Sequence, residues 1–190
     1  MKVLLVSEGK HELSGSLETL VRRLSSLKLE VDHDRVSRGD IHAHHGKGQG
    51  FFKRALRWML EARKRGYEAL VLVVDEDGQA ERVKEMTAAQ ESSLIAFRRA
   101  LGIAVRTFDA WMLADEKALS SILGGEIERQ PSPEGIHNPK QVCMKLRDEC
   151  KADLAQSEMY AKLAEAIELP ILEQRCARGF APFAHRVKTL

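Results

Sequence analysis

The chain has 190 residues, a length expected for one domain with appendages, and its hydrophobic share of 44% is sufficient for a buried core. The 30 Lys and Arg residues nearly balance the 28 Asp and Glu residues, so the net charge of +2 does not by itself indicate nucleic-acid binding. The opening segment MKVLLVSEG turns polar too early for a signal peptide, no long apolar run follows, and the three cysteines form no CxxC pair. We therefore expect a cytoplasmic protein with reduced thiols and no membrane association.

Hydrophobic periodicity predicts four strands that alternate with helices. The predicted strands are 2–6, 29–37, 69–78 and 103–108. The predicted helices are 13–28, 51–64, 79–100 and 109–123. The repeated strand–helix order predicts an α/β fold with an open, mostly parallel four-stranded sheet flanked by helices.

The second part of the chain has a different pattern. Residues 123–137 are rich in Pro and Gly and are typical of a linker. Asn138-Pro139 then has the pattern of an N-cap followed by proline at the first helical position. Residues 138–190 are expected to form a helical C-terminal extension after a first domain that covers residues 1–122.

Three of the four predicted strands end in acidic residues. Glu8 follows the first strand, Asp75 and Asp77 follow the third, and Asp109 follows the fourth. Ligands of open parallel sheets bind at the carboxyl ends of the strands, and Mg²⁺ prefers carboxylate oxygens and retained water. Because Asp75 and Asp77 are two residues apart, extended backbone would point both side chains the same way, and Gly78 permits a tight turn after them.

The alternative for each acid is a local structural role. Acidic side chains after strands are common N-caps, and Asp109 has that position before the predicted helix 109–123. Glu8 alone has the pattern of a turn residue. A single cap does not explain three adjacent acids at 75–77, which repel one another unless a cation offsets their charge.

These motifs resemble the TOPRIM superfamily, the metal-binding domain of topoisomerases, primases and several nucleases. The resemblance rests on Glu8-Gly9 after one strand and Asp75-x-Asp77-Gly78 after another. EGKHE (8–12) together with FDAWMLAD (108–115) is similar to a TOPRIM-like family of prokaryotic proteins that are often encoded beside an ABC-type ATPase in defence loci.

The resemblance implies a Mg²⁺- or Mn²⁺-dependent nuclease. Glu8 would be the acid–base carboxylate, Asp75 and Asp77 would bind the metal, and Glu12 would be a neighbour of the metal site. Asp109, a further candidate metal ligand, stands where relatives carry Glu. The implied partners are nucleic acid and an ABC-type ATPase, with a homodimer as a further assembly. A non-catalytic binding or regulatory subunit of an ATPase is the alternative function.

A Gly- and His-rich segment precedes the helix 51–64. Lys10, Lys47, Lys53 and Arg54 are the candidate phosphate-binding residues, and the N-terminus of this helix would attract phosphate. A solvated loop is the alternative. His42, His44 and His45 have no Cys or acidic partner at a zinc-ligand spacing, and their role stays open. The chain has no GxSxG motif, which argues against an acyl-transfer hydrolase.

Overall fold

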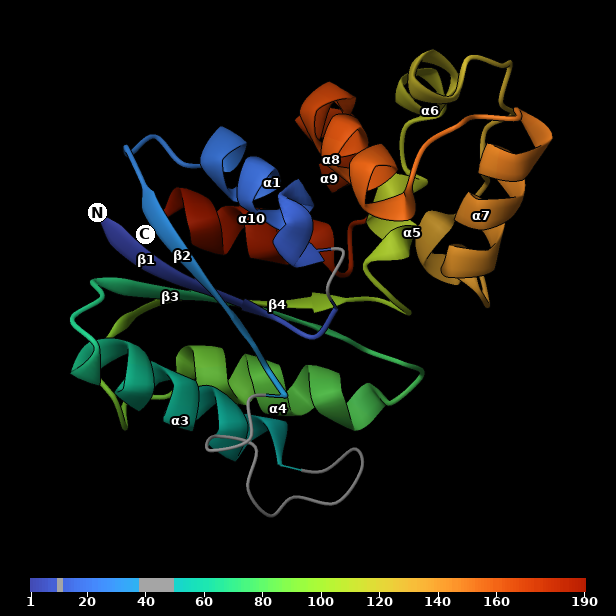
Figure 1. Ribbon diagram of the computed structural model, residues 1–190. Coiled ribbons are helices and arrows are strands. Elements are labelled where there is room, and N and C mark those ends of the chain that lie inside the picture. Colours follow the sequence, from blue (N-terminus) through green and yellow to red (C-terminus); the bar gives the residue numbers. More distant parts are fainter. Residues whose placement is uncertain (10–11, 38–49) are drawn as a thin grey trace.

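The computed structural model of the protein describes residues 1–9, 12–37 and 50–190 (Figure 1). Four parallel strands form one sheet in the order β2-β1-β3-β4. The strands are β1 (Lys2–Ser7), β2 (Glu30–Arg35), β3 (Ala69–Asp75) and β4 (Arg98–Ala104). The predicted α/β fold with a parallel four-stranded sheet is therefore confirmed.

Helices connect the strands and continue after the last one. Those of the first half are the short 3-10 helix η1 (Glu12–Ser14), α1 (Ser16–Leu24), α3 (Phe51–Lys64) and α4 (Ala80–Glu91). Those after β4 are α5 (Asp109–Met112), α6 (Glu116–Leu123), η2 (Pro133–Gly135), α7 (Pro139–Glu149), α8 (Gln156–Ala166), α9 (Leu169–Arg175) and α10 (Phe180–Lys188). In the described residues, no helix has the length and apolar character needed to span a membrane.

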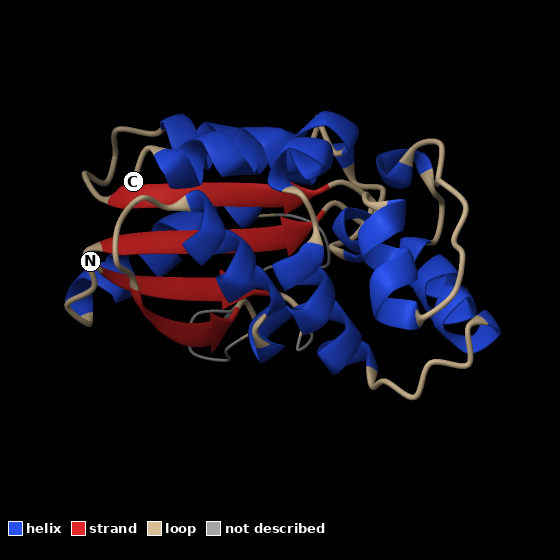
Figure 2. Ribbon diagram, turned by 90° about the horizontal axis from the view of Figure 1, so that it is seen from above, coloured by secondary structure: helices blue, strands red, loops and turns tan. Residues whose placement is uncertain are grey.

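The helices form a layer on each face of the sheet. Figure 1 shows α3 and α4 on one face and α1 with α10 on the other. Seen from above in Figure 2, all four strands run toward the side of the molecule where α5, α6 and α7 lie. The carboxyl ends of the strands therefore meet the segment that follows β4, and this edge is where the acidic residues are expected.

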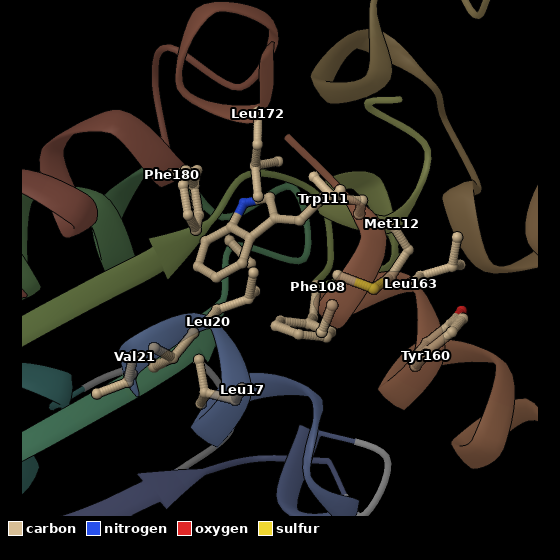
Figure 3. Close-up of a cluster of buried hydrophobic side chains, with 14 of the residues drawn as sticks. Leu17, Leu20, Val21, Phe108, Trp111, Met112, Tyr160, Leu163, Leu172 and Phe180 are labelled. Atoms are coloured by element: carbon tan, nitrogen blue, oxygen red, sulfur yellow. The ribbon is translucent and has the colours of Figure 1, made fainter. Parts of the chain in front are cut away.

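Buried apolar side chains lie on both sides of the sheet. The cluster under α3 and α4 includes Trp58, which is fully buried. The larger cluster on the other face extends along the chain from Val3 to Val187, so residues of the C-terminal helices belong to the same core as β1. Figure 3 shows its centre, where the Trp111 indole packs against Phe180 with ring centroids 5.0 Å apart.

The fourth strand begins earlier than its sequence pattern predicts. The predicted strand was 103–108 and the preceding helix was 79–100, whereas β4 covers Arg98–Ala104 and α4 ends at Glu91. Gly102, which interrupts the apolar pattern, lies in mid-strand, where a Cβ would come within 2.7 Å of the Phe183 ring of α10. The close packing of α10 against β4 therefore explains why a glycine occupies this position in the strand.

The predicted helix 109–123 is two helices. The carboxylate of Asp115 accepts hydrogen bonds from the backbone N–H groups of Lys117 (3.0 Å) and Ala118 (3.1 Å) and thereby caps α6. A further N–H, that of Glu168, donates to the same carboxylate at 3.1 Å. The N-cap expected at Asp109 is wrong, because Asp115 performs this role and the Asp109 side chain makes other contacts.

Candidate active site

Glu8 and Asp75 meet at the carboxyl ends of the two central strands. The backbone N–H of Asp75 donates to Glu8 Oε2 at 2.9 Å, so the Glu8 side chain reaches across from the end of β1 to the end of β3. The Asp75 carboxylate in turn accepts a 2.8 Å hydrogen bond from the backbone N–H of Phe108, which follows β4. Three adjacent strand ends are thus joined through two carboxylates.

Glu12 is more buried than Glu8, Asp75 or Asp77, with 7% of its surface exposed. It lies in η1, and its Oε2 is buried without a hydrogen-bond partner in the described part of the chain. Its carboxylate packs directly against Gly9, where an added Cβ would overlap the carboxylate oxygens. A side chain at position 9 would force the Glu12 carboxylate to move, so the glycine of the Glu8-Gly9 motif leaves space for the second acid.

Asp109 lies at the start of α5 and faces α8. Its Oδ1 accepts hydrogen bonds from the Tyr160 hydroxyl and, at 3.3 Å, from Gln156 Nε2. Figure 3 shows Tyr160 at the rim of the apolar cluster around Trp111. The role predicted for Asp109 as a metal ligand stays a prediction, and one of its two oxygens is already held by α8.

Asp77 is placed differently from the prediction that paired it with Asp75 on extended backbone. It follows the end of β3 with a φ of 51°, so the chain has already turned and the two side chains do not extend from one strand face. Asp77 Oδ2 accepts a 2.8 Å hydrogen bond from Arg82 Nη1 and is half exposed. It also lines a cleft of about 200 Å³ together with Gly78, Arg106, Thr107 and His137.

Arg82 is the cation at the centre of the carboxylates. The same Nη1 atom lies 2.6 Å from the carbonyl oxygen of Asp75 and 3.5 Å from Glu8 Oε2. The Arg82 side chain is 9% exposed, and its guanidinium lies 4.7 Å from the ring centroid of Phe51. The position between Glu8 and Asp77 is therefore held by a guanidinium in this structure.

The protonation of the acids is shifted by burial and by one another. Burial raises the pKa of Glu8, although the Asp75 amide and the Arg82 charge lower it in part. Burial also raises the pKa of Glu12 to about 7, with added repulsion from Asp109 and Glu8. The pKa of Asp75 lies well above its ordinary value because of burial and the neighbouring Glu12 charge. Mutual repulsion of this kind is characteristic of functional sites.

The chemistry of these donors fits a hard divalent cation. Mg²⁺ binds carboxylate oxygens and keeps several waters, and the unpartnered Glu12 Oε2 is an oxygen of that type. Within residues 1–9, 12–37 and 50–190, however, no three His, Cys, Asp or Glu side chains are arranged to hold one ion. We attribute the lack of such a three-residue site to the Arg82 guanidinium, which lies between Glu8 and Asp77.

Arg54 is a buried cation whose charge acts on Glu8. Its residue is 6% exposed, and its guanidinium lies 4.5 Å from the Phe51 ring centroid on α3. Its Nε has no hydrogen-bond partner among the described residues, and its charge lowers the pKa of Glu8. Burial in turn lowers the pKa of Arg54. Lys53, the other predicted phosphate-binding residue of α3, is exposed.

The N-terminus of α3 is not the open phosphate site that the sequence indicated. The Glu85 carboxylate of α4 accepts hydrogen bonds from the N–H groups of Phe51 (2.7 Å) and Gly50 (3.2 Å). The protein's own Glu85 carboxylate therefore already occupies the anion position at this helix N-terminus. The other candidates of that group, Lys10 and Lys47, and the histidines His42, His44 and His45, lie outside the described residues.

Sequence reasoning missed Arg82 and Tyr160. Arg82 carried a local signal, since a basic residue in the first turn of a helix is unfavourable next to the helix dipole and needs an acidic partner. Tyr160 carried none, because it lies 51 residues after Asp109 in the chain.

One comparison with known proteins found a match. A family model described as "Domain of unknown function (DUF4276)" matches residues 8–188, which include all the acids described above. No curated protein and no solved structure matches the chain.

Proposed function

Because the chain belongs to the DUF4276 family, its activity is inferred from its site, and we propose that it is a Mg²⁺- or Mn²⁺-dependent phosphodiester hydrolase of the TOPRIM type that acts on nucleic acid. One observation carries the proposal. Partly buried acids with raised pKa values gather at the carboxyl ends of β1 and β3, within reach of the charge of the buried Arg54 guanidinium. Acids for a metal and a cation for a phosphate are the two groups that such a reaction requires.

The acids divide into two roles. Glu12, Asp75 and Asp77 would hold the metal once Asp77 is released from Arg82, because the described acids as they stand do not form a three-residue site for one ion. The metal would neutralise phosphate charge and lower the pKa of a bound water. Glu8 is the acid–base group, because its Oε2 is fixed by the Asp75 amide while its Oε1 makes no hydrogen bond within the described ranges. Because the pKa of Glu8 is raised, it lies closer to neutral pH, where a carboxyl group can both accept and release a proton.

Arg54 is the residue that we assign to the substrate phosphate. A guanidinium keeps its charge at all ordinary pH values, and burying its Nε without a hydrogen-bond partner is costly. Its stacking on Phe51 offsets part of that cost. A phosphate oxygen would supply the hydrogen bonds that the described residues do not, and Lys53 would add an exposed positive charge on the same helix.

A second function is favoured by Arg82. Since its guanidinium already neutralises Glu8 and Asp77, the acids can be a stabilising network in a non-catalytic subunit that binds a partner such as an ABC-type ATPase. The two functions differ in their need for metal. The ATPase, a homodimer and the nucleic acid itself stay predictions.

The test is a cleavage screen on DNA and RNA substrates with Mg²⁺ or Mn²⁺. We expect cleavage by the wild type and loss of cleavage in Glu8→Gln, which keeps the size and the hydrogen-bonding shape of the side chain. Glu126→Gln is the matched control, because Glu126 is exposed and distant in sequence from the site. Equal cleavage by the wild type and Glu8→Gln would refute the assignment, and no metal-dependent cleavage by the wild type on any substrate would favour the binding function.

A further inference from the structure

Arg82 reaches the acids because β3 and α4 meet at one edge of the sheet. Figure 1 shows that β3 runs to the edge at which α4 begins. Arg82 lies in the first turn of α4, five residues after Asp77, and its Nη1 contacts the Asp77 carboxylate (2.8 Å), the Asp75 carbonyl (2.6 Å) and the Glu8 carboxylate (3.5 Å). One nitrogen atom therefore joins the ends of two strands.

The surroundings hold the guanidinium in this place. The side chain is 9% exposed and stacks over Phe51, and its Nε is buried without a partner in the described residues. A fully satisfied structural arginine would use both edges of its fork. Arg82 instead directs one nitrogen at three oxygens, which is the environment that a small cation would have.

We propose that Arg82 is an internal counterion, which holds Glu8 and Asp77 together in the metal-free protein and competes with a divalent cation for the Asp77 carboxylate. The competition with a metal rests on the proposed function. The role of Arg82 in the metal-free protein does not depend on that function. Glu8 is partly buried and Asp77 is half exposed, and the repulsion between their like charges is unfavourable without an opposite charge. The guanidinium supplies that charge when no metal is bound.

Competition predicts that removing the positive charge improves metal binding. Arg82→Gln retains a donor for the Asp75 carbonyl but lacks the charge, so the Asp77 carboxylate is left to the ion. We expect the dissociation constant for Mn²⁺ to fall by about tenfold, equivalent to ~1.4 kcal/mol. Arg82→Lys keeps the charge and should bind Mn²⁺ as the wild type does.

The experiment is isothermal titration of each full-length variant with MnCl₂, with thermal melting in EDTA as a second measurement. Arg65→Met is the matched control, because Arg65 forms a 2.8 Å ion pair with Asp34 that involves none of these acids. We expect Arg82→Gln to lower the melting temperature in EDTA, and to lower it much less when Asp77→Asn is also present, because the two side chains are coupled.

The outcomes separate the two proposals. Tighter Mn²⁺ binding by Arg82→Gln alone, together with the coupling to Asp77, supports the internal counterion. Mn²⁺ binding by the wild type with no gain in Arg82→Gln overturns the competition and leaves the metal-dependent function standing. No Mn²⁺ binding by any variant overturns both the competition and the metal-dependent function. A melting-temperature loss that is the same with and without Asp77→Asn overturns the role of Arg82 in the metal-free protein.

Discussion

Replacement of Glu12 by Gln should change the pH dependence of stability in a direction that the structure determines. Glu12 is 7% exposed, and burial raises its pKa from 4.5 to about 7. A carboxyl group whose folded-state pKa is raised binds more protons in the folded state than in the unfolded state between these two values. Its contribution to stability is therefore fully present below pH 4.5 and is lost as the pH rises through about 7.

The magnitude follows from the two pKa values. At about 1.4 kcal/mol per pKa unit, the difference between 4.5 and about 7 corresponds to about 3 kcal/mol that ionised Glu12 costs the folded protein above neutrality. Glu12→Gln removes the ionisation and keeps the shape of the side chain. In EDTA at pH 8.5 we expect the variant to be more stable than the wild type by about that amount. At pH 4.5 we expect the two proteins to have similar stability.

Urea denaturation followed by circular dichroism at a series of pH values measures this effect. Glu126→Gln, at an exposed acid, should show no such pH dependence and serves as the control. The reasoning would be refuted if Glu12→Gln destabilised the protein equally at pH 4.5 and pH 8.5, because its pKa would then be ordinary in the folded state. Addition of Mg²⁺ at pH 8.5 should stabilise the wild type more than the variant if Glu12 is a neighbour of the metal.

Two further predictions concern the scaffold that positions the site. Gly102→Ala should destabilise the protein by about 1–3 kcal/mol, because its Cβ would lie 2.7 Å from the Phe183 ring, and a lower urea midpoint with an unchanged far-UV spectrum would show this. Asp115→Ala removes the cap of α6, at a cost of about 1 kcal/mol, and also the acceptor for the Glu168 N–H. Thermal melting of Asp115→Ala should therefore show a larger loss than Asp115→Asn, and equal melting temperatures would contradict this account.

Local patterns in the sequence predicted the order of elements and the edge of the sheet where the acids lie. The buried strands 2–6 and 69–75 are apolar enough to be identified without tertiary contacts, and parallel strands bring their carboxyl ends to one edge. The helix 51–64 was predicted with the observed bounds, since its apolar residues recur with helical spacing and Gly66 follows it. For these elements the local and the tertiary preferences agree.

Tertiary structure decided what the acids contact. Gly102 suits the middle of β4 because α10 packs closely against the strand there. Helices α5 and α6 are separate because the Asp115 carboxylate accepts hydrogen bonds from three N–H groups, one of them from Glu168. Arg82 lies among the carboxylates because the turn after β3 directs α4 back along the sheet, which a pattern of residue types does not encode. A sequence by itself can place charges at the end of a strand. A neighbouring guanidinium or a metal ion can balance these charges. Which of them does so depends on distances of a few ångströms between elements far apart in the chain, and only tertiary packing determines those distances.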